Sequence, residues 1–348
     1  MAEENGFREE DQELFEHYRF EVDRGQGLLR VDKYLMLKIE NASRNKIQSA
    51  ANAGNILVNN KVVKRSYKVK PDDIISVFMA HPIRETELIP EDIPVEILYE
   101  DNDVIVVNKV AGMVVHPAYG NYQGTLVNAL IYHFHLTGEI QNKNGAGPYL
   151  VHRIDKDTSG VIMAAKNEES QIKLGKQFYN HTLERKYVAL VWGDVKEEQG
   201  TITGNIGRSL KNRKIFRVFP EGDYGKHAVT HYKVLERFGY VTLVECKLET
   251  GRTHQIRVHL KYIGHTLFND ETYGGNEILK GTTFTKYKQF VKNCFKICQR
   301  QALHAKSLGF IHPATREKMF FDTPLPPDME EVLEKWRKYA VHKALGKE

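Results

Sequence analysis

Tight turns between short apolar segments are the feature that most restricts the fold of this chain. The segments 95–99 and 104–108 are rich in Val, Ile and Leu, and the turn residues 101–103 (Asp-Asn-Asp) separate them. Strand patterns this close together predict an antiparallel hairpin. Further patterns follow, helical at 125–133 and about 168–178, and strand-like at 186–192, 229–235 and 240–248. Hairpins outnumber strand–helix–strand crossovers, so we expect an α+β fold with a mixed, mainly antiparallel sheet.

The amino-terminal part of the chain predicts a separate small unit. At about 150 residues per domain, 348 residues correspond to two domains. One short helix is expected to bury an apolar face over 31–39, and a second runs between the N-cap Ser43 and the terminating Gly54. Strand patterns then follow at 56–58, 62–63 and 74–77. The chain is thereby divided into an acidic N-terminal segment (1–27), a small unit (28–80), a linker with three prolines (81–94) and a large domain (95–348).

Charge is distributed unevenly between these parts. Residues 1–29 hold three basic and nine acidic residues, whereas residues 30–80 hold ten basic and four acidic ones. A local basic excess suits a polyanion such as nucleic acid, since each neutralised phosphate releases counterions. A solvated lysine-rich face is the alternative. The candidate nucleic-acid contacts are Arg30, Arg44, Lys46, Lys61, Lys64, Arg65 and Lys68.

The sequence also argues against several classes of protein. No window approaches the roughly 18 uncharged apolar residues of a membrane span, and the acidic start is unlike a signal peptide. Three cysteines without a Cys-x-x-Cys pair favour neither a disulfide framework nor a zinc site, and suit a cytoplasmic location. Nucleotide-binding fingerprints are missing, and His254 and His259 lack the zincin spacing, so we expect no cofactor and no metal. A monomer is the default expectation.

Four strings of the large domain attract attention: Val107–Pro117, His152–Gly160, Leu248–His259 and Arg300–Ala305. In the second, Asp155 stands between the cations Arg153 and Lys156. An aspartate in a turn-prone string commonly caps the turn. The functional alternative is a carboxylate that neighbouring cations keep ionised, and that acts as a nucleophile or stabilises a sugar cation. Asp157 is expected to be structural, because a glycosidase pair must flank one bond and adjacent turn positions rarely allow that.

The third string predicts a loop that enters a helix, with Thr253 as its N-cap and Gly264 as its end. Ile256, Leu260 and Ile263 form its buried face, while His254, Arg257 and Lys261 share another face. Arg257 could pair with Asp155 or with a phosphate in a bidentate fork, or could remain an exposed helix charge.

Tyr187 lies in a strand pattern beside Arg185 and Lys186. Most strand tyrosines are packing residues, but one beside two cations can stack on a base and, with its pKa lowered by them, take a proton. A basic loop follows, which either grips a substrate or is a solvated loop. Its members are Arg208, Lys211, Arg213, Lys214 and Arg217. We add Arg153, Arg208 and Arg213 to the candidate nucleic-acid contacts.

The small unit resembles the S4-type RNA-binding domain. The strings that carry this resemblance are Arg30-Val-Asp-Lys-Tyr-Leu35, Ser43-Arg44, Gly54-Asn-Ile-Leu-Val-Asn59 and Lys61-Val-Val-Lys64. One departure is Asp72, which stands where the family usually has a glycine before its acidic residue. The resemblance implies that residues 28–80 bind RNA.

Over residues 28 to about 330 the chain resembles the RluA/RluD-type pseudouridine synthase family, and within it the S4-bearing branch that acts on 23S ribosomal RNA. The strings that match are His152-Arg-Ile-Asp-Lys-Asp-Thr-Ser-Gly160, Ala228-Val-Thr-His-Tyr232, Gly251-Arg-Thr-His-Gln-Ile-Arg257 and Arg300-Gln-Ala-Leu-His304. By position, Asp155 matches the family's catalytic aspartate, Tyr187 its active-site tyrosine and Arg257 the arginine that pairs with the aspartate. The resemblance implies isomerisation of uridine to pseudouridine, a reaction without redox change and hence without a cofactor.

Two other functions are compatible with parts of this pattern. A non-catalytic RNA chaperone would need the basic surface but not the combination of Asp155, Tyr187 and Arg257. A metal-dependent hydrolase acting on sugar or phosphate would lose its activity when EDTA removes the metal. The sequence does not choose between attack on the sugar and elimination to a glycal as the route of isomerisation.

Overall fold

The computed structural model of the protein describes residues 15–39, 44–79, 88–117, 121–137, 148–209, 212 and 215–345. For residues 15, 45, 46, 79, 343 and 344 it describes the backbone alone. Contacts within the chain divide it into two compact units, Met1–Thr86 and Glu87–Glu348. The division falls inside the segment 81–94, for which the sequence predicts a linker. Each unit has a hydrophobic core of its own.

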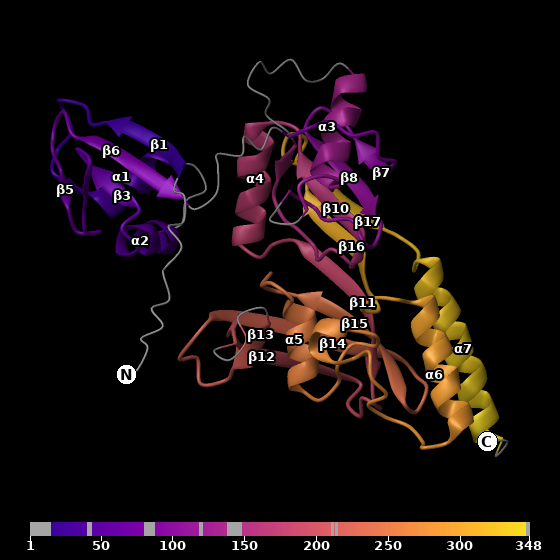
Figure 1. Ribbon diagram of the computed structural model, residues 1–348. Coiled ribbons are helices and arrows are strands. Elements are labelled where there is room, and N and C mark those ends of the chain that lie inside the picture. The colour runs from indigo at the N-terminus through magenta and orange to yellow at the C-terminus, as the bar shows by residue number, and fades with distance from the viewer. Residues whose placement is uncertain are drawn as a thin grey trace, which may run out of the picture. The chain divides into compact units, whose positions relative to one another are not determined.

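The first unit combines two helices with two small sheets (Figure 1). Its elements are β1 (Phe15–Glu21), β2 (Leu29–Arg30), α1 (Val31–Lys38), α2 (Arg44–Asn52), β3 (Ile56–Val58), β4 (Lys61–Val62), β5 (Lys68–Val69) and β6 (Ile74–Met79). One sheet has the order β1-β6-β3-β4, and β2 pairs with β5 in the other. The apolar face expected over 31–39 is buried in the core of this unit. Strand β1 was not predicted, because an acidic, polar segment carries no clear strand pattern.

Three non-glycine residues in the turns of this unit adopt left-handed backbone conformations. Asn59 and Asn60 connect β3 to β4 with φ of 49° and 65°, as a two-residue hairpin turn requires. Asp72 has φ of 64°, so the residue that replaces the usual glycine keeps a glycine-like conformation. Aspartate tolerates this region better than most side chains, and Arg24 donates to its carboxylate at 3.2 Å.

The second unit is organised around one large mixed sheet (Figure 1). Its strands are β7 (Glu96–Glu100), β8 (Val104–Lys109), β9 (Tyr149–Leu150), β10 (Ser159–Ala165), β11 (Glu184–Trp192), β12 (Gln199–Arg208), β13 (Phe216–Phe219), β14 (Lys226–Arg237), β15 (Val241–Leu248), β16 (Leu303–Ile311) and β17 (Lys318–Asp322). The main order is β13-β12-β14-β15-β11-β16-β10-β8-β7, with β17 on β16 and β9 on β10. Among the described strands only β10 and β16 pair in parallel, so the predicted α+β class with a mainly antiparallel sheet is confirmed.

Helices cover both faces of this sheet. They are α3 (Leu126–Leu136), α4 (Glu168–Tyr179), α5 (Gln255–Tyr262), α6 (Thr285–Ile297) and α7 (Pro327–Ala344), with a 3₁₀ turn at Glu271–Tyr273. Alternate residues of a strand point to opposite faces. Ile105 and Val107 of β8 accordingly pack with α3, whereas Val104 and Val106 belong to the cluster that includes Leu174 of α4. Both helices predicted for this region are confirmed, and Thr125 caps α3 in a capping box.

Residues of α6 and α7 form a second core with β11 (Figure 1). Trp192 lies within this core beside Phe268 and Trp336, with ring centroids 5.1 and 6.5 Å away. The buried cluster also holds Cys294 and Cys298, both as free thiols. Strand β11 therefore has a packed helix layer behind it, and its other face is available to support a site.

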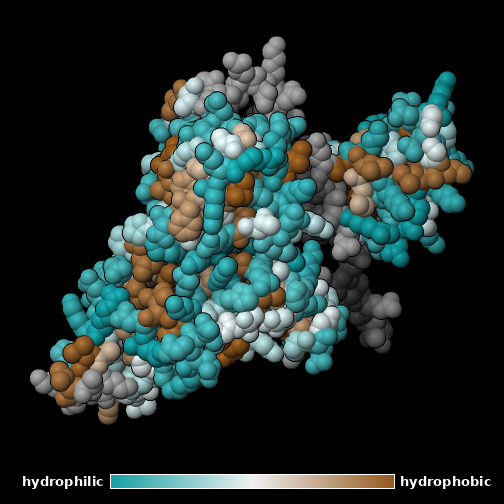
Figure 2. All heavy atoms as spheres, turned by 180° about the vertical axis from the view of Figure 1, so that it is seen from behind, coloured by the Kyte–Doolittle hydropathy of each residue, from teal (hydrophilic) through white to brown (hydrophobic). Residues whose placement is uncertain are grey.

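Hydrophilic side chains cover most of the face that Figure 2 shows, and the hydrophobic ones form small groups between them. Within the described ranges, every helix is too short or too polar to cross a lipid bilayer.

Candidate active site

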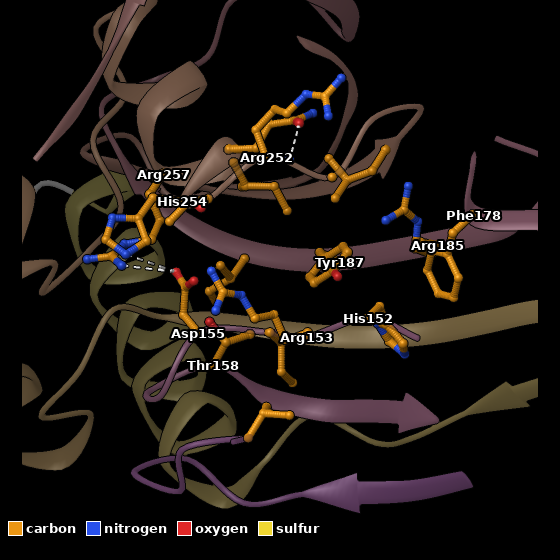
Figure 3. A pocket seen from close by; sticks show the side chains of 18 of the residues that line it. His152, Arg153, Asp155, Thr158, Phe178, Arg185, Tyr187, Arg252, His254 and Arg257 are labelled. Atoms are coloured by element: carbon orange, nitrogen blue, oxygen red, sulfur yellow. Dashed lines mark hydrogen bonds and ion pairs between the residues drawn. The ribbon is translucent and has the colours of Figure 1, made fainter. Parts of the chain in front are cut away.

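Three segments from distant parts of the chain line one pocket in the middle of the large sheet (Figure 3). The loop between β9 and β10 provides Asp155, strand β11 provides Tyr187, and the first turn of α5 provides Arg257. The pocket has a volume of about 930 Å³, near the upper end of the range of about 300–1,000 Å³ typical of small-molecule sites. All three residues singled out as catalytic candidates therefore share one cavity.

Asp155 and Arg257 are in direct contact, as predicted. Arg257 Nη1 donates to Asp155 Oδ2 at 3.0 Å, and both groups line the pocket. The same guanidinium forms a bidentate pair with the fully buried Asp270, at 2.7 and 2.8 Å. Burial alone lowers the pKa of Arg257, but the hydrogen bonds and charge of Asp270, with Asp155, raise it overall. Arg257 is thus a fixed cation held between two carboxylates.

Asp270 was not among the predicted site residues. It follows Arg257 by 13 positions in an irregular segment, where no periodic pattern distinguishes one aspartate from another. Asp270 also caps the 3₁₀ turn by accepting from Tyr273 N–H at 3.2 Å. Its carboxylate contacts Nε and Nη2 of Arg257, and Nη1, the remaining nitrogen, contacts Asp155. Asp270 therefore determines the orientation of the guanidinium.

The helix that carries Arg257 begins differently from the prediction. The N-cap is His254, in a left-handed conformation with φ of 55°, and its side chain makes no capping hydrogen bond. The prediction that Thr253 caps this helix is therefore wrong. The buried Gln255 side chain secures the turn instead, since its Oε1 accepts from Thr250 Oγ1 and Arg252 N–H at 2.8 and 3.0 Å. Gly264, with φ of 87°, follows the end of the helix as predicted.

The three residues expected to share a second face of α5 all contact one short segment. His254 Nδ1 lies 2.9 Å from the hydroxyl of Tyr273, and Lys261 donates to the Tyr273 carbonyl at 2.8 Å. The Arg257 guanidinium lies 5.0 Å from the centroid of the same ring. His254 Nε2 is 4.0 Å from Asp155 Oδ2, so Tyr273 supports both side chains that approach the carboxylate.

Tyr187 does not have the electrostatic surroundings that the sequence suggested. Strand alternation places Lys186 on the opposite face of the sheet, where it pairs with Glu245 at 3.4 Å. Burial raises the pKa of Tyr187, and this effect outweighs the lowering by Arg185. The prediction that two cations lower its pKa is therefore wrong. The phenol is protonated at neutral pH.

The buried Lys109 and the partly buried Arg300 hold the loop that carries Asp155. Lys109 Nζ donates to the carbonyls of Val110, Met113 and Lys156 at 2.8, 2.8 and 2.9 Å. Arg300 Nη1 donates to the Asp157 carbonyl at 3.0 Å. The backbone carbonyls of Lys156 and Asp157, the two residues after Asp155, are therefore both held by hydrogen bonds. Lys109 belongs to the first string and Arg300 to the fourth, and their contacts give both strings a structural role that sequence reasoning did not assign.

Replacing Lys109 with methionine is expected to displace Asp155. Burial lowers the pKa of Lys109 to about 7, and its three carbonyl partners would lose their donors. Unsatisfied buried groups cost about 1–3 kcal/mol each, and a catalytic group misplaced by about 1 Å loses about 10²-fold in rate. We expect kcat to fall about 100-fold with little change in KM, measured by steady-state kinetics. Lys318→Met, at an exposed position of β17, is the control, and an unchanged kcat in Lys109→Met would contradict the role.

His304 predicts a pH dependence of stability. It bridges Ser159, the first residue of β10, and Thr323, at 2.9 and 3.0 Å, and burial lowers its pKa to about 4. Between pH 6.5 and 4 the unfolded chain binds a proton there and the folded chain does not, so stability falls as pH falls through this window. We expect His304→Gln to remove about 2 kcal/mol of the difference in unfolding free energy between pH 7 and 4.5. Urea titrations at both pH values measure the unfolding free energy of the two proteins. An equal loss of unfolding free energy between pH 7 and 4.5 in the wild-type protein and in His304→Gln would argue against this assignment.

Four of the candidate RNA contacts in the first unit lie together. Arg30 pairs with the buried Asp32 at 2.8 Å, and Arg44 lies 3.9 Å from the same carboxylate. Gln48 bonds Asp32 and accepts from Arg65 at 3.4 Å, and Lys68 is opposite Arg30 in the β2–β5 ladder. Of the other candidates, Lys61 and Lys64 are exposed on and beside β4, and the side chain of Lys46 lies outside the described residues.

The candidate contacts of the second unit occupy two places. Arg153 is exposed at the pocket, two residues before Asp155. Arg208 and Arg217 lie over the rings of Phe216 and Phe219, with 4.9 Å from each guanidinium to its ring centroid. Lys211, Arg213 and Lys214, predicted for the same basic loop, lie outside the described residues.

One group of side chains in the described part of the chain has ligand types suited to a metal, namely Asp101, Asp103 and His312. Hydrogen bonds already use most of the ligand atoms of this group, although His312 Nε2 makes none of suitable geometry. His312 Nδ1 accepts from Ala314 and Thr315 N–H at 3.3 and 3.1 Å, which leaves the proton on Nε2, 2.8 Å from Asp101. Asp101 Oδ1 accepts two further backbone N–H groups. The arrangement therefore suits a hydrogen-bonded turn better than a cation site.

Comparison with known proteins adds to this geometry. Residues 103–262 match the RNA pseudouridylate synthase family, and residues 29–75 match the S4 domain. An uncharacterized RNA pseudouridine synthase of Chlorobaculum parvum is 50% identical over 91% of this chain and 97% of its own length. The ribosomal large subunit pseudouridine synthase D of Zymomonas mobilis is 40% identical over 86% of this chain and 92% of its own.

A solved structure supports the fold. The human RNA pseudouridylate synthase domain containing 4 protein superimposes with a TM-score of 0.53 at 24% identity, covering 70% of this chain and 93% of that one. At this identity the match concerns the architecture.

Proposed function

This chain belongs to the family of RNA pseudouridine synthases, which isomerise uridine to pseudouridine, and we propose that its substrate is a uridine in 23S ribosomal RNA. The relatives named as large-subunit enzymes support this substrate. The observation that carries the proposal is the 3.0 Å contact between Asp155 and Arg257 on the wall of a pocket of about 930 Å³. A base inside a helix cannot reach such a pocket, so the uridine must be everted, which costs a few kcal/mol.

In this proposal Asp155 acts on the ribose of the everted uridine. Isomerisation breaks the bond from N1 to C1′, turns the free base and forms a bond from C5 to C1′. The carboxylate either attacks C1′ or removes a proton from the sugar to give a glycal, and both routes need it ionised and within reach. Arg257 meets both requirements, because its fixed charge favours the anion and the hydrogen bond from Nη1 orients the oxygen.

We assign to Tyr187 the contact with the base. Its ring lies beside Asp155 in the pocket (Figure 3), and aromatic stacking on a nucleobase contributes about 1–3 kcal/mol. Because the phenol is protonated, it can remove the C5 proton only by a relay, in which its oxygen accepts that proton as it passes its own to water in the pocket.

Tyr187→Phe separates these two roles. The variant keeps the ring and loses the relay, so RNA affinity should persist while release of the C5 proton slows about 10²-fold or more. Tyr187→Leu should lose affinity as well. Binding titrations and release of tritium from 5-tritiated uridine measure the two effects. A fully active Phe variant would restrict Tyr187 to stacking.

The first unit is proposed to hold the RNA around the target. Arg30, Arg44, Arg65 and Lys68 gather near Asp32, whose pKa is raised by burial but lowered overall by hydrogen bonds from Arg30 and Gln48. A carboxylate surrounded in this way arranges several cations for phosphate contact. We further propose that the enzyme works in the cytoplasm, as a monomer and without metal or cofactor; the three free thiols suit a reducing compartment.

The function is tested with purified enzyme and 23S ribosomal RNA from cells that lack the gene. We expect tritium release from 5-tritiated uridine and one or more new pseudouridines in carbodiimide primer extension, in the presence of EDTA as well. Absence of both signals on naked RNA and on large-subunit precursors would refute the proposed substrate.

A further inference from the structure

One buried cation in the pocket has no anion beside it. Arg185 is 93% buried and lines the cavity, yet no carboxylate of the described residues lies within ion-pair distance of it. Its Nη2 donates to the Glu249 carbonyl at 3.3 Å, and its Nε has no hydrogen-bond partner in the described part of the chain. Buried charges in proteins are normally paired, because an isolated ion loses its hydration without compensation. Arg185 is therefore a buried cation that lacks a partner anion among the described residues.

The surroundings of Arg185 are built to hold the guanidinium in place. It lies 5.4 Å from the centroid of the Phe178 ring, and that ring stacks on His152 at 4.7 Å. His152 Nε2 accepts from Met163 N–H at 3.1 Å, so its orientation is fixed too. Burial, aided by Arg185, lowers the pKa of His152 to about 3, and the ring is neutral. It thus offers no negative charge to Arg185.

Gly251 leaves the space that the guanidinium occupies. A Cβ atom at this position would lie 2.9 Å from Arg185 Nη1, closer than such contacts allow. Gly251 belongs to the pocket wall just before α5. The absence of a side chain there leaves room for the guanidinium in its present position.

Arg185 lies away from the reacting centre but in the same cavity. Strand alternation places it on the face of β11 that also bears Tyr187, about 7 Å further along the strand. In Figure 3 Tyr187 lies between Asp155 at one end and Arg185 with Phe178 at the other. The wall near Arg185 also includes Tyr179, which is 84% exposed, and His181. This end of the cavity is open, cationic and aromatic, which suits a segment of single-stranded RNA.

We propose that Arg185 binds a backbone phosphate of the substrate RNA, in the linkage adjoining the everted uridine. The proposal rests on the proposed function and adds a subsite to it. A phosphodiester supplies the anion that the protein lacks, and a guanidinium matches its oxygens in a bidentate geometry. Bound there, the phosphate sets the distance from the backbone to the base stacked on Tyr187 and so positions the ribose at Asp155.

Ethylation interference tests this subsite at single-phosphate resolution. A 23S ribosomal RNA fragment that the enzyme modifies is ethylated at about one phosphate per molecule, and bound and free RNA are separated and mapped. With wild-type enzyme we expect ethylation of a phosphate next to the target uridine to prevent binding of the RNA. With Arg185→Met the interference at that phosphate should vanish, while interference elsewhere persists. Lys186→Met removes a charge from the neighbouring residue on the opposite face of the sheet, and should keep the full wild-type pattern.

Affinity and stability provide independent readouts. Loss of one charge-assisted contact should weaken RNA binding of Arg185→Met by about tenfold or more. The plot of the logarithm of the RNA-binding constant against the logarithm of salt concentration should become less steep by about 0.7, which is the contribution of one single-stranded phosphate. Because the variant removes an unpaired buried charge, its melting temperature should not fall. Gly251→Ala, which crowds Arg185 Nη1 and keeps its charge, should weaken the interference at the same phosphate without abolishing it.

The outcomes separate this subsite from the proposed function. If wild-type enzyme modifies no ribosomal RNA fragment, the proposed function fails, and the subsite with it. If the enzyme modifies the RNA but Arg185→Met leaves the interference pattern and the salt slope unchanged, the subsite alone is refuted. A lowered melting temperature with unchanged RNA affinity would likewise assign Arg185 a packing role.

Discussion

Replacing Asp155 with asparagine is expected to reduce isomerisation by at least about 10⁴-fold, as loss of a nucleophilic group does in other enzymes. The amide has nearly the same shape but carries no charge, so it can neither attack the sugar nor offset a developing sugar cation. Binding of RNA should change little, because Asp155 contributes no positive charge to it. Tritium release and RNA binding, measured side by side, distinguish the two effects.

Asp157 offers the matched control for this experiment. It lies two residues further along the same loop, and Arg300 contacts its backbone carbonyl. Asp157→Asn should therefore retain turnover within a few-fold of the wild-type rate. Equal activity of Asp155→Asn and the unmodified enzyme would remove Asp155 from the mechanism. Equal losses in both variants would instead point to damage to the loop.

The second large effect is expected at Arg257. Its guanidinium is almost fully buried between Asp155 and Asp270, with contacts at 3.0, 2.7 and 2.8 Å. Arg257→Met would leave Asp270 as a buried anion without a partner, and removal of one partner of such a pair costs about 3–5 kcal/mol. We expect a fall of this size in the free energy of unfolding, together with loss of turnover. Urea denaturation and tritium release measure them.

A double variant separates the two roles of Arg257. In Arg257→Met with Asp270→Asn the orphaned charge is gone, so a large part of the lost stability should return. Turnover should not return, because nothing then orients Asp155. If stability stays as low as in the single variant, the cost arises from packing around Tyr273 and not from the uncompensated carboxylate. If turnover recovers, Arg257 acts only through stability.

Local pattern was sufficient for many elements of this fold. The hairpin of β7 and β8, helices α3 and α4 and the buried face of α1 follow from apolar spacing and turn residues over short stretches of chain. Pairings between distant segments are different, because they depend on which strands the sheet brings together. The parallel contact of β10 with β16 joins Ser159 to His304, and no spacing within either strand encodes it.

The same distinction applies to the site. Asp155, Tyr187 and Arg257 were identified because their strings resemble those of known enzymes, and the structure places them in one pocket. Asp270 was missed because its role depends on a partner in a different element. The start of α5 was predicted incorrectly because a buried glutamine side chain, and not a local cap, secures its first turn.

Arg300 connects the Asp155 loop to the start of α7. It donates to Asp328 with two bonds, at 2.8 and 3.0 Å, and to the Asp157 carbonyl with a third nitrogen. During synthesis the loop is made long before α7 leaves the ribosome, so a nascent chain that already contains Asp155 and Arg257 still lacks this anchor. The ion pair that fixes Arg300 at this loop can therefore form only after the segment around residue 328 has been translated.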